Sequence, residues 1–244
     1  MEGDAGWSER ESSDEELRAE VVLGGRVLHA SGLSDLVWGH VSRRDPEGRG
    51  VWMKASGLGF EEVTGVDVLL VADDGRILVG DRPRHSEYPI HTELLRARRD
   101  ANSVVHVHPR HAIALAASGR PLEAFSHVAG LFPAGVRCYD YAPGLVVTAE
   151  EGAALAGALG GDRALLLRGH GVVTVGASVA LAVTTAVMLE RACEQQLLAE
   201  GFGGVKLPFT AEEATRAYGH TLTDPHLLSA WAYLVRRLEA ASGG

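Results

Sequence analysis

The sequence predicts a single α/β domain built around a mixed, mainly antiparallel sheet. Apolar runs with strand character alternate with helical patterns. Several strands follow one another without a helix between them, which argues against a doubly wound parallel sheet. No repeat or Pro/Ser-rich linker divides the 244 residues, a length that can bury one large core. We therefore expect residues 14–244 to form one domain and residues 1–13, rich in Ser, Glu, Asp and Gly, to form a disordered tail.

The first part of the domain combines one helix with a series of short strands. A helix over residues 14–30 starts with acidic side chains, which suit the positive end of a helix dipole. Ser31-Gly32 ends it. Strands are predicted over residues 37–44 and 50–56, and residues 67–80 read as two strands around an Asp-Gly turn.

The remaining chain alternates more regularly between helices and strands. Pro89 opens one predicted helix and Gly119 closes the next, as each residue commonly does. Residues 163–176 read as two strands joined at the turn Gly169-His170-Gly171. The other strands are expected over residues 102–108 and 135–141, and the helices over residues 89–99, 110–119, 149–161, 178–200 and 225–240.

Composition excludes several classes of protein. The formal net charge is −9 and no basic block is present, which argues against nucleic acid as the partner. No apolar run reaches the roughly 18 residues of a membrane helix, and the acidic start does not resemble a signal peptide. Two cysteines without CxxC spacing fit a reducing cytoplasm, where we expect the protein. A small anionic substrate stays possible, because local groups decide that.

The stretch SVVHVHPRH places His106 and His108 two residues apart at the end of an apolar run. Residues i and i+2 of a strand point to the same face, so the two imidazoles can share one cation. Pro109 ends the strand and places the pair at a sheet edge or loop mouth. The alternative is a pair of structural histidines that are satisfied by hydrogen bonds.

Two other stretches carry polar groups that could take part in catalysis or metal binding. His170 lies between two glycines after an apolar strand, where the backbone can pass close to a neighbour or adopt unusual dihedrals. Glu87 precedes the Pro89 that opens a helix, and its carboxylate can ligate a metal or act as an acid/base group. The alternatives are a histidine in an ordinary strand turn and a carboxylate that only stabilises the helix start.

These pieces stand in an order that resembles the class II aldolase/adducin family. From about Leu17 to Glu200 the chain shows, in this order, GHVS, KASG, DVLLVADDG, HSEYPIH, VVHVH and LLLRGHGVV. The resemblance implies a three-layer αβα sandwich with the mixed sheet in its centre. It also implies a cyclic homotetramer with sites near the subunit contacts. His127 is then a candidate for reaching a neighbouring subunit's site.

The resemblance further implies one divalent metal ion per subunit. Three histidines hold it in the family's enzymes, and these match His106, His108 and His170. The family's acid/base glutamate, which can also ligate the metal, matches Glu87. Zinc is the expected ion, with manganese, cobalt and iron as alternatives. Members that serve structural roles lack these histidines, so their presence favours an enzyme.

The substrate-binding positions depart from the sugar-phosphate aldolases of the family. Those enzymes carry an Asn in GN-S and paired serines in SSE, where this chain has His40 and His85. Bulkier histidines leave less room for a tetrahedral phosphate. His91 and His111, on predicted helices, could orient other site residues or lie at the surface. The expected substrate contacts are His40, Lys54, Ser56, Gly57, His85 and Ser86.

These departures favour the decarboxylase branch of the family. The expected function is a metal-dependent carbon–carbon lyase that decarboxylates a hydroxyaromatic or β-keto carboxylic acid. In this mechanism the metal stabilises a developing enolate and Glu87 moves the proton. The main alternative is a class II sugar or sugar-phosphate aldolase or epimerase. An iron-dependent oxygenase and a non-catalytic scaffold on the same fold are the remaining alternatives.

Overall fold

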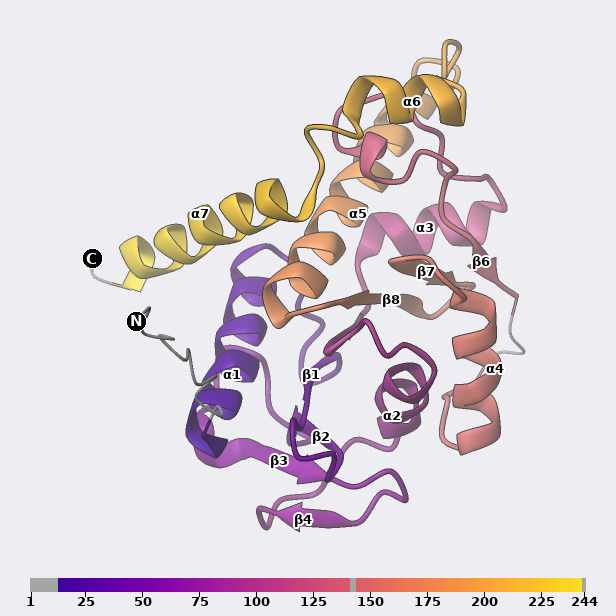
Figure 1. The fold of residues 1–244 in the computed structure, drawn as a ribbon. Coiled ribbons are helices and arrows are strands. Elements are labelled where there is room, and N and C mark those ends of the chain that lie inside the picture. The colour runs from indigo at the N-terminus through magenta and orange to yellow at the C-terminus, as the bar shows by residue number, and fades with distance from the viewer. Residues whose placement is uncertain (1–12, 141–143, 243–244) are drawn as a thin grey trace, which may run out of the picture.

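The computed structural model describes residues 13–140 and 144–242, and its strands form one sheet (Figure 1). The eight strands are β1 (His40–Arg44), β2 (Val51–Lys54), β3 (Val68–Val71), β4 (Ile77–Val79), β5 (Ser103–Val107), β6 (Cys138–Tyr139), β7 (Ala164–Leu167) and β8 (Gly171–Gly176). Their order is β4-β3-β2-β1-β5-β8-β7-β6, and only the β6–β7 pair is parallel. The predicted mixed, mainly antiparallel sheet is therefore confirmed.

Seven helices accompany the sheet in the described ranges. The first begins at a capping box, in which the Ser13 hydroxyl accepts from the Glu16 amide and the Glu16 carboxylate accepts from the Ser13 amide. This explains the predicted start at residue 14. The helices are α1 (Asp14–Ala30), α2 (Tyr88–Ala97), α3 (Arg110–Ser118), α4 (Ala149–Leu159), α5 (Val179–Glu200), α6 (Ala211–Tyr218) and α7 (Asp224–Ser242).

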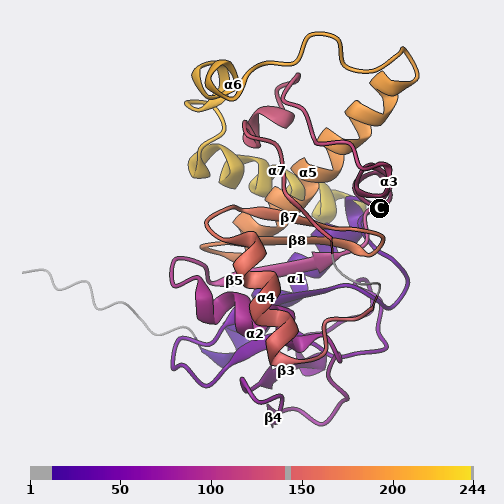
Figure 2. The ribbon, with the colours of Figure 1, turned by 90° about the vertical axis from the view of Figure 1, so that its right-hand side faces the viewer.

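The helices cover both faces of the sheet and make three layers (Figures 1 and 2). One core packs α2 and α4 on one face, and a second packs α1, α3 and α5 on the other. Side chains of the central strands alternate between the two cores, as Val104 and Val105 of β5 show. The predicted αβα sandwich is confirmed, and buried side chains on both faces fix the strand register.

Three details differ from the sequence prediction. The strand expected over residues 102–108 ends at Val107, because Pro109 begins the turn into α3. The strand expected over residues 135–141 is reduced to the two residues of β6, and residue 141 lies outside the described ranges. Helix α6 was not predicted, although the capping box between Thr210 and Glu213 is a sequence signal for it. Of the predicted tail, only Ser13 is described.

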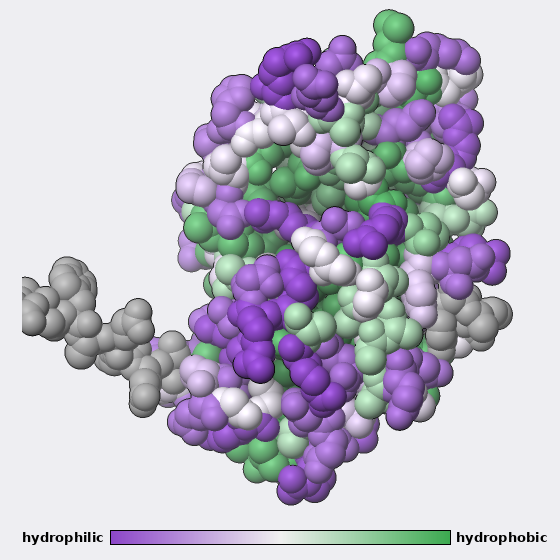
Figure 3. Space-filling model, turned by 45° about the vertical axis from the view of Figure 1, so that its right-hand side comes forward, coloured by the Kyte–Doolittle hydropathy of each residue, from purple (hydrophilic) through white to green (hydrophobic). Residues whose placement is uncertain are grey.

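The outside of the molecule is mostly polar. Hydrophilic residues cover much of the face in Figure 3, and apolar surface lies recessed between them in the upper half. Helix α7 leans away from the body of the sandwich (Figure 1). Among the described residues, no helix combines the length and the apolar character that crossing a bilayer requires.

Candidate active site

The candidate site forms where β1 and β5, two central strands, lie side by side. His40 is the register partner of His106, so both side chains lie on the face that α2 covers. Glu87 is the N-cap residue of α2, which places its carboxylate beside both rings. Its Oε2 lies 3.9 Å from Nε2 of His40 and 3.7 Å from Nε2 of His106. Strand pairing and one helix start therefore bring together groups that are far apart in the sequence.

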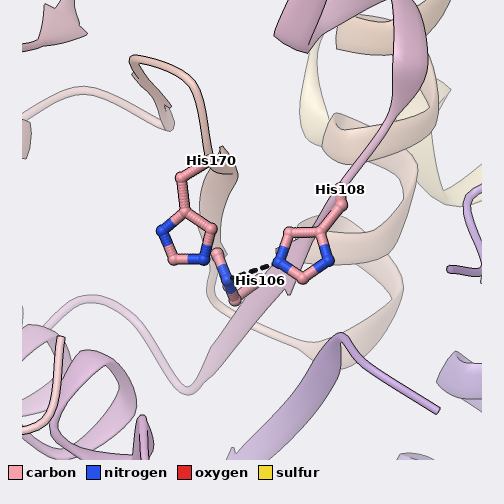
Figure 4. Close-up of side chains that lie close together, drawn as sticks. All are labelled: His106, His108 and His170. Carbon is pink, nitrogen blue, oxygen red and sulfur yellow. Dashed lines mark hydrogen bonds between the residues drawn. The ribbon is translucent and has the colours of Figure 1, made fainter. Parts of the chain in front are cut away.

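Three histidines converge on one another at this edge of the site (Figure 4). His106 comes from β5, His108 follows the strand by one residue, and His170 comes from the turn between β7 and β8. Although the strand ends at Val107, the ring of His108 still turns toward His106, and their Nε2 atoms are 3.2 Å apart. One ligand atom from each histidine lies within 4.8 Å of the others. The structure thus brings together the three predicted metal ligands.

The glycines around His170 each have a steric reason. Gly169 has φ +70°, a left-handed conformation that side chains disfavour. A Cβ on Gly171 would lie 2.5 Å from the Val107 carbonyl oxygen, so only glycine permits this close approach of β8 to the end of β5. The turn therefore places His170 beside the β5 histidines, as the glycine pattern suggested.

The hydrogen bonds of two of these rings fit a bound cation. Nδ1 of His106 donates to the Val172 carbonyl at 3.0 Å, and Nδ1 of His108 donates to the Asp35 carboxylate at 3.1 Å. In the neutral rings both Nε2 atoms then carry lone pairs, and these face each other. Burial lowers the pKa of both imidazoles, so protonation does not relieve the repulsion. A divalent ion relieves it, and this donor set suits zinc or a similar metal.

The Glu87 carboxyl is poised for proton transfer. Burial raises its pKa from 4.5 to about 7, and a hydrogen bond from the Val146 amide to Oε1 at 3.0 Å opposes the rise. Nε2 of His170 lies 3.7 Å from the same oxygen. In the metal-free site both protonation states are therefore populated near neutral pH, which suits a group that must give and take a proton.

His40 is held by a buried hydrogen-bond chain. Its Nδ1 shares a 2.6 Å hydrogen bond with Nε2 of His91, and Nδ1 of His91 lies 2.6 Å from the Ser42 hydroxyl. Burial is the main cause that lowers the pKa of His40 well below its ordinary value and that of His91 to about 3. His91 therefore orients a neutral His40 toward Glu87. His111, by contrast, pairs with Glu190 at 2.8 Å.

A cleft of about 600 Å³ opens onto these groups. Four predicted substrate contacts line it together with Glu87, His108 and His170: His40, Ser56, His85 and Ser86. The ring of His85 lies 4.5 Å from that of His40, centroid to centroid, and its buried Nε2 has no hydrogen-bond partner among residues 13–140 and 144–242. Burial lowers the pKa of His85 to about 3, so this ring is also neutral.

The other predicted contacts lie elsewhere. Lys54 is buried, and its ammonium donates to the carbonyls of Leu58 at 2.6 Å, Val37 at 3.0 Å and Ala55 at 3.4 Å. Because three carbonyls take its protons, this placement favours a structural role over contact with substrate. Gly57, at φ +83°, is exposed outside the cleft lining.

Several cleft residues were not among the sequence predictions. Asp35 supports His108 from a distant loop, and Trp38 lies near it at the mouth of the cleft. Arg110 and Ile113 of α3 and Leu145 complete that side of the lining. Arg110 could have been noticed, because it follows the histidine pair at the start of a predicted helix. The others depend on long-range packing that no local spacing reveals.

The fold is an αβα sandwich, and at its central strands three histidines and an adjacent carboxylate lie close enough together to hold a metal ion. Residues 19–197 match the family model of the Class II Aldolase and Adducin N-terminal domain, and the chain belongs to that family. The resemblance seen in the sequence motifs is thereby confirmed.

Individual relatives within the family differ in reaction. The chain is 36% identical over 203 residues to a 3,4-dihydroxyphthalate decarboxylase from Terrabacter sp., covering 77% of this chain and 83% of that protein. It is 31% identical to a 5-deoxy-D-ribulose 1-phosphate aldolase from Bacillus thuringiensis, covering 78% and 88%. An aldolase II superfamily protein from Pseudomonas syringae superposes with a TM-score of 0.83 at 28% identity, covering 95% and 96%. The relatives support a lyase of this family.

Proposed function

We propose that this protein is a metal-dependent decarboxylase that acts on a hydroxyaromatic or β-keto carboxylic acid. The observation that carries the proposal is the pair of buried, neutral imidazoles, His40 and His85, beside Glu87 in the cleft. A carboxylate bound against these two neutral rings loses water and gains no cationic partner from them. Loss of neutral carbon dioxide relieves this cost, whereas a phosphate dianion in the same place keeps its charge.

Three histidines, His106, His108 and His170, would hold the metal ion, with Glu87 as a further candidate ligand. A bound divalent ion supplies Lewis-acid stabilisation of negative charge on a substrate oxygen. The bond from the substrate carbon to its carboxylate breaks, the electron pair stays on that carbon in conjugation with the neighbouring oxygen, and carbon dioxide leaves. Protonated Glu87 then delivers the proton that replaces it. The Val146 amide holds Oε1 of this carboxyl in place.

The relatives support this assignment and also define the alternative. Two decarboxylases of 3,4-dihydroxyphthalate, at 34% and 36% identity, act on a hydroxyaromatic acid. A sugar-phosphate aldolase is the second candidate, because the hydroxyl-bearing Ser56 and Ser86 line the cleft and an aldolase relative matches at 31% identity. Both reactions leave an electron pair on carbon next to a carbonyl, so both can use Glu87.

The proposal includes a homotetramer. His127 is exposed and packs against Tyr218 with 5.6 Å between ring centroids, and it does not line the cleft of its own chain. This position supports the hypothesis that His127 acts in the site of a neighbouring subunit.

A carbon dioxide release assay tests the reaction. The protein is stripped of metal, reloaded separately with zinc, manganese or iron(II), and given a panel of hydroxyaromatic acids, β-keto acids and sugar phosphates. We expect metal-dependent release that Glu87→Gln lowers by roughly 100-fold or more, as loss of an acid/base group does. Glu150→Gln, at an exposed carboxylate on α4, is the matched control and should keep full activity. Aldehyde formation from sugar phosphates without carbon dioxide release would overturn the proposal.

A further inference from the structure

Arg110 presents an unused guanidinium to the cleft. It is the first residue of α3, two positions after His108, and it is exposed where it lines the cleft. Its side chain makes no hydrogen bond or ion pair with residues 13–140 and 144–242. Arg120, just beyond the other end of α3, instead pairs with Glu200 at 3.0 Å. A planar donor of five protons is thus free to meet a ligand beside the metal histidines.

The start of α3 is fixed by a partly buried carboxylate of the protein itself. Backbone amides of His111 and Ala112 donate to the two carboxylate oxygens of Glu190, at 3.1 and 3.0 Å. Two of the free amides of the helix start are therefore already bonded to a carboxylate, so the helix end is not itself offered as the anion site. Arg110 and Ile113 lie three residues apart, so both project from the helix face that lines the cleft.

Among the charged side chains of the cleft lining, that of Arg110 can bind an anionic group of the substrate. The acidic residues of the cleft lining are Asp35, which pairs with His108, and Glu87. Lys54 gives its protons to carbonyls. Among the described residues, the lining therefore contains one cationic side chain of the Lys/Arg type, that of Arg110. The metal ion would attract one anionic group of a substrate to the histidines, whereas a second anionic group would find its cationic partner in this guanidinium.

The mouth of the cleft next to Arg110 is apolar. The side chains of Trp38 and Leu145 remain 54% and 52% exposed there, and Ile113 lies with them. Trp38 is held by a tight turn, in which its amide donates to the Asp35 carbonyl at 3.0 Å and Leu36 adopts φ +49°. A non-glycine residue with positive φ stores strain that tends to persist at functional sites. The turn thus fixes the backbone that carries this half-exposed indole, a side chain suited to stacking on a planar ring.

We propose that Arg110 binds a carboxylate that the substrate retains, and that the ring of this substrate, an aromatic acid, packs against Trp38. This inference rests on the proposed decarboxylase function. An ion pair with the departing carboxylate would vanish as neutral carbon dioxide forms, so it would stabilise the bound substrate more than the transition state. A guanidinium on a second carboxylate keeps its partner throughout the reaction. The substrate class is therefore an aromatic dicarboxylic acid.

Direct binding of small probes tests the anchor without turnover. The full chain, loaded with metal, is titrated with phthalate, benzoate, catechol and glycerol 3-phosphate by calorimetry and by tryptophan fluorescence. We expect phthalate to bind most tightly. Arg110→Met should weaken phthalate binding by roughly tenfold to 100-fold, the effect of a lost charge-assisted hydrogen-bond pair. Binding of neutral catechol should stay unchanged, and Arg110→Lys should restore part of the phthalate affinity.

Two variants provide the controls. Arg99→Met removes the same charge from an exposed arginine just beyond the C-terminal end of α2, the end opposite Glu87, and should leave phthalate binding unchanged. Trp38→Phe should abolish the phthalate-dependent change in tryptophan emission while calorimetry still detects binding. Metal content and circular dichroism should match the parent protein in every variant.

Three results would overturn the inference: equal phthalate affinity in Arg110→Met and the parent protein, absence of phthalate binding, and tighter binding of glycerol 3-phosphate that depends on Arg110. The last would identify the anion as a phosphate ester. A failed carbon dioxide assay alongside Arg110-dependent phthalate binding would refute the proposed reaction but leave the anchor intact, so the two failures are distinguishable.

Discussion

Replacing Glu87 by glutamine is expected to change how the stability of the metal-free protein depends on pH. Burial raises the pKa of this carboxyl from 4.5 to about 7. Between these values the folded chain keeps a proton that the unfolded chain has lost, so the contribution of Glu87 to stability falls as the pH rises. The rise of this pKa from 4.5 to about 7 corresponds to about 3 kcal/mol of lost stability when Glu87 is fully ionised.

The difference between variant and parent isolates this contribution. The contribution of the neighbouring histidines to the free energy of unfolding falls in the opposite direction, as the pH is lowered. These histidines are present in both proteins, so their contribution cancels in the comparison. Relative to the parent, Glu87→Gln should gain about 2.5 kcal/mol between pH 5 and pH 8. Guanidinium unfolding with a chelator, at one protein concentration, measures it. A difference between Glu87→Gln and the parent protein that does not change with pH would refute the raised pKa.

Two further substitutions test how the backbone supports the site. Gly171→Ala places a Cβ 2.5 Å from the Val107 carbonyl, so zinc affinity should fall by roughly tenfold or more in a chelator competition, as for lost metal-site support. Gly157→Ala, in open space on α4, should leave zinc affinity unchanged. Glu190→Gln removes the charged acceptor of two backbone amides at the start of α3 and should cost about 1–2 kcal/mol of unfolding free energy. If the exposed Glu194→Gln costs as much in denaturant titrations, the capping argument is wrong.

Local sequence patterns were enough to find the candidate metal ligands, but not the residues that hold the site's side chains in place by hydrogen bonds. The two-residue spacing of His106 and His108 reports a shared face, because side-chain direction in a strand repeats with period two. The glycines around His170 likewise report a steric need within the turn. The Asp35 carboxylate and the Val146 amide reach the site from loops whose position depends on the whole fold, so no local pattern could place them.

Lys54 shows the limit of interpreting a residue by type. An ammonium near an expected anion site suggests a substrate contact, and nothing in the strand pattern argues otherwise. Three loop carbonyls take its protons in the fold, and the geometry of those loops is a tertiary property. Helix α6 was missed for a different reason: it has only eight residues and is mostly polar, although its few apolar side chains follow helical spacing and a capping box marks its start.

The site divides into two parts that can be altered separately. Metal and proton-transfer groups stand in or beside paired strands whose two faces are buried, so changing them disturbs the core. Trp38, Arg110, Ile113 and Leu145 instead contribute side chains from loops and one helix start at the mouth of the cleft. A mutant library limited to these four positions should therefore shift substrate preference while thermal stability holds. The mouth of the cleft is thus the place to change which carboxylic acid is accepted, with the reaction centre left unchanged.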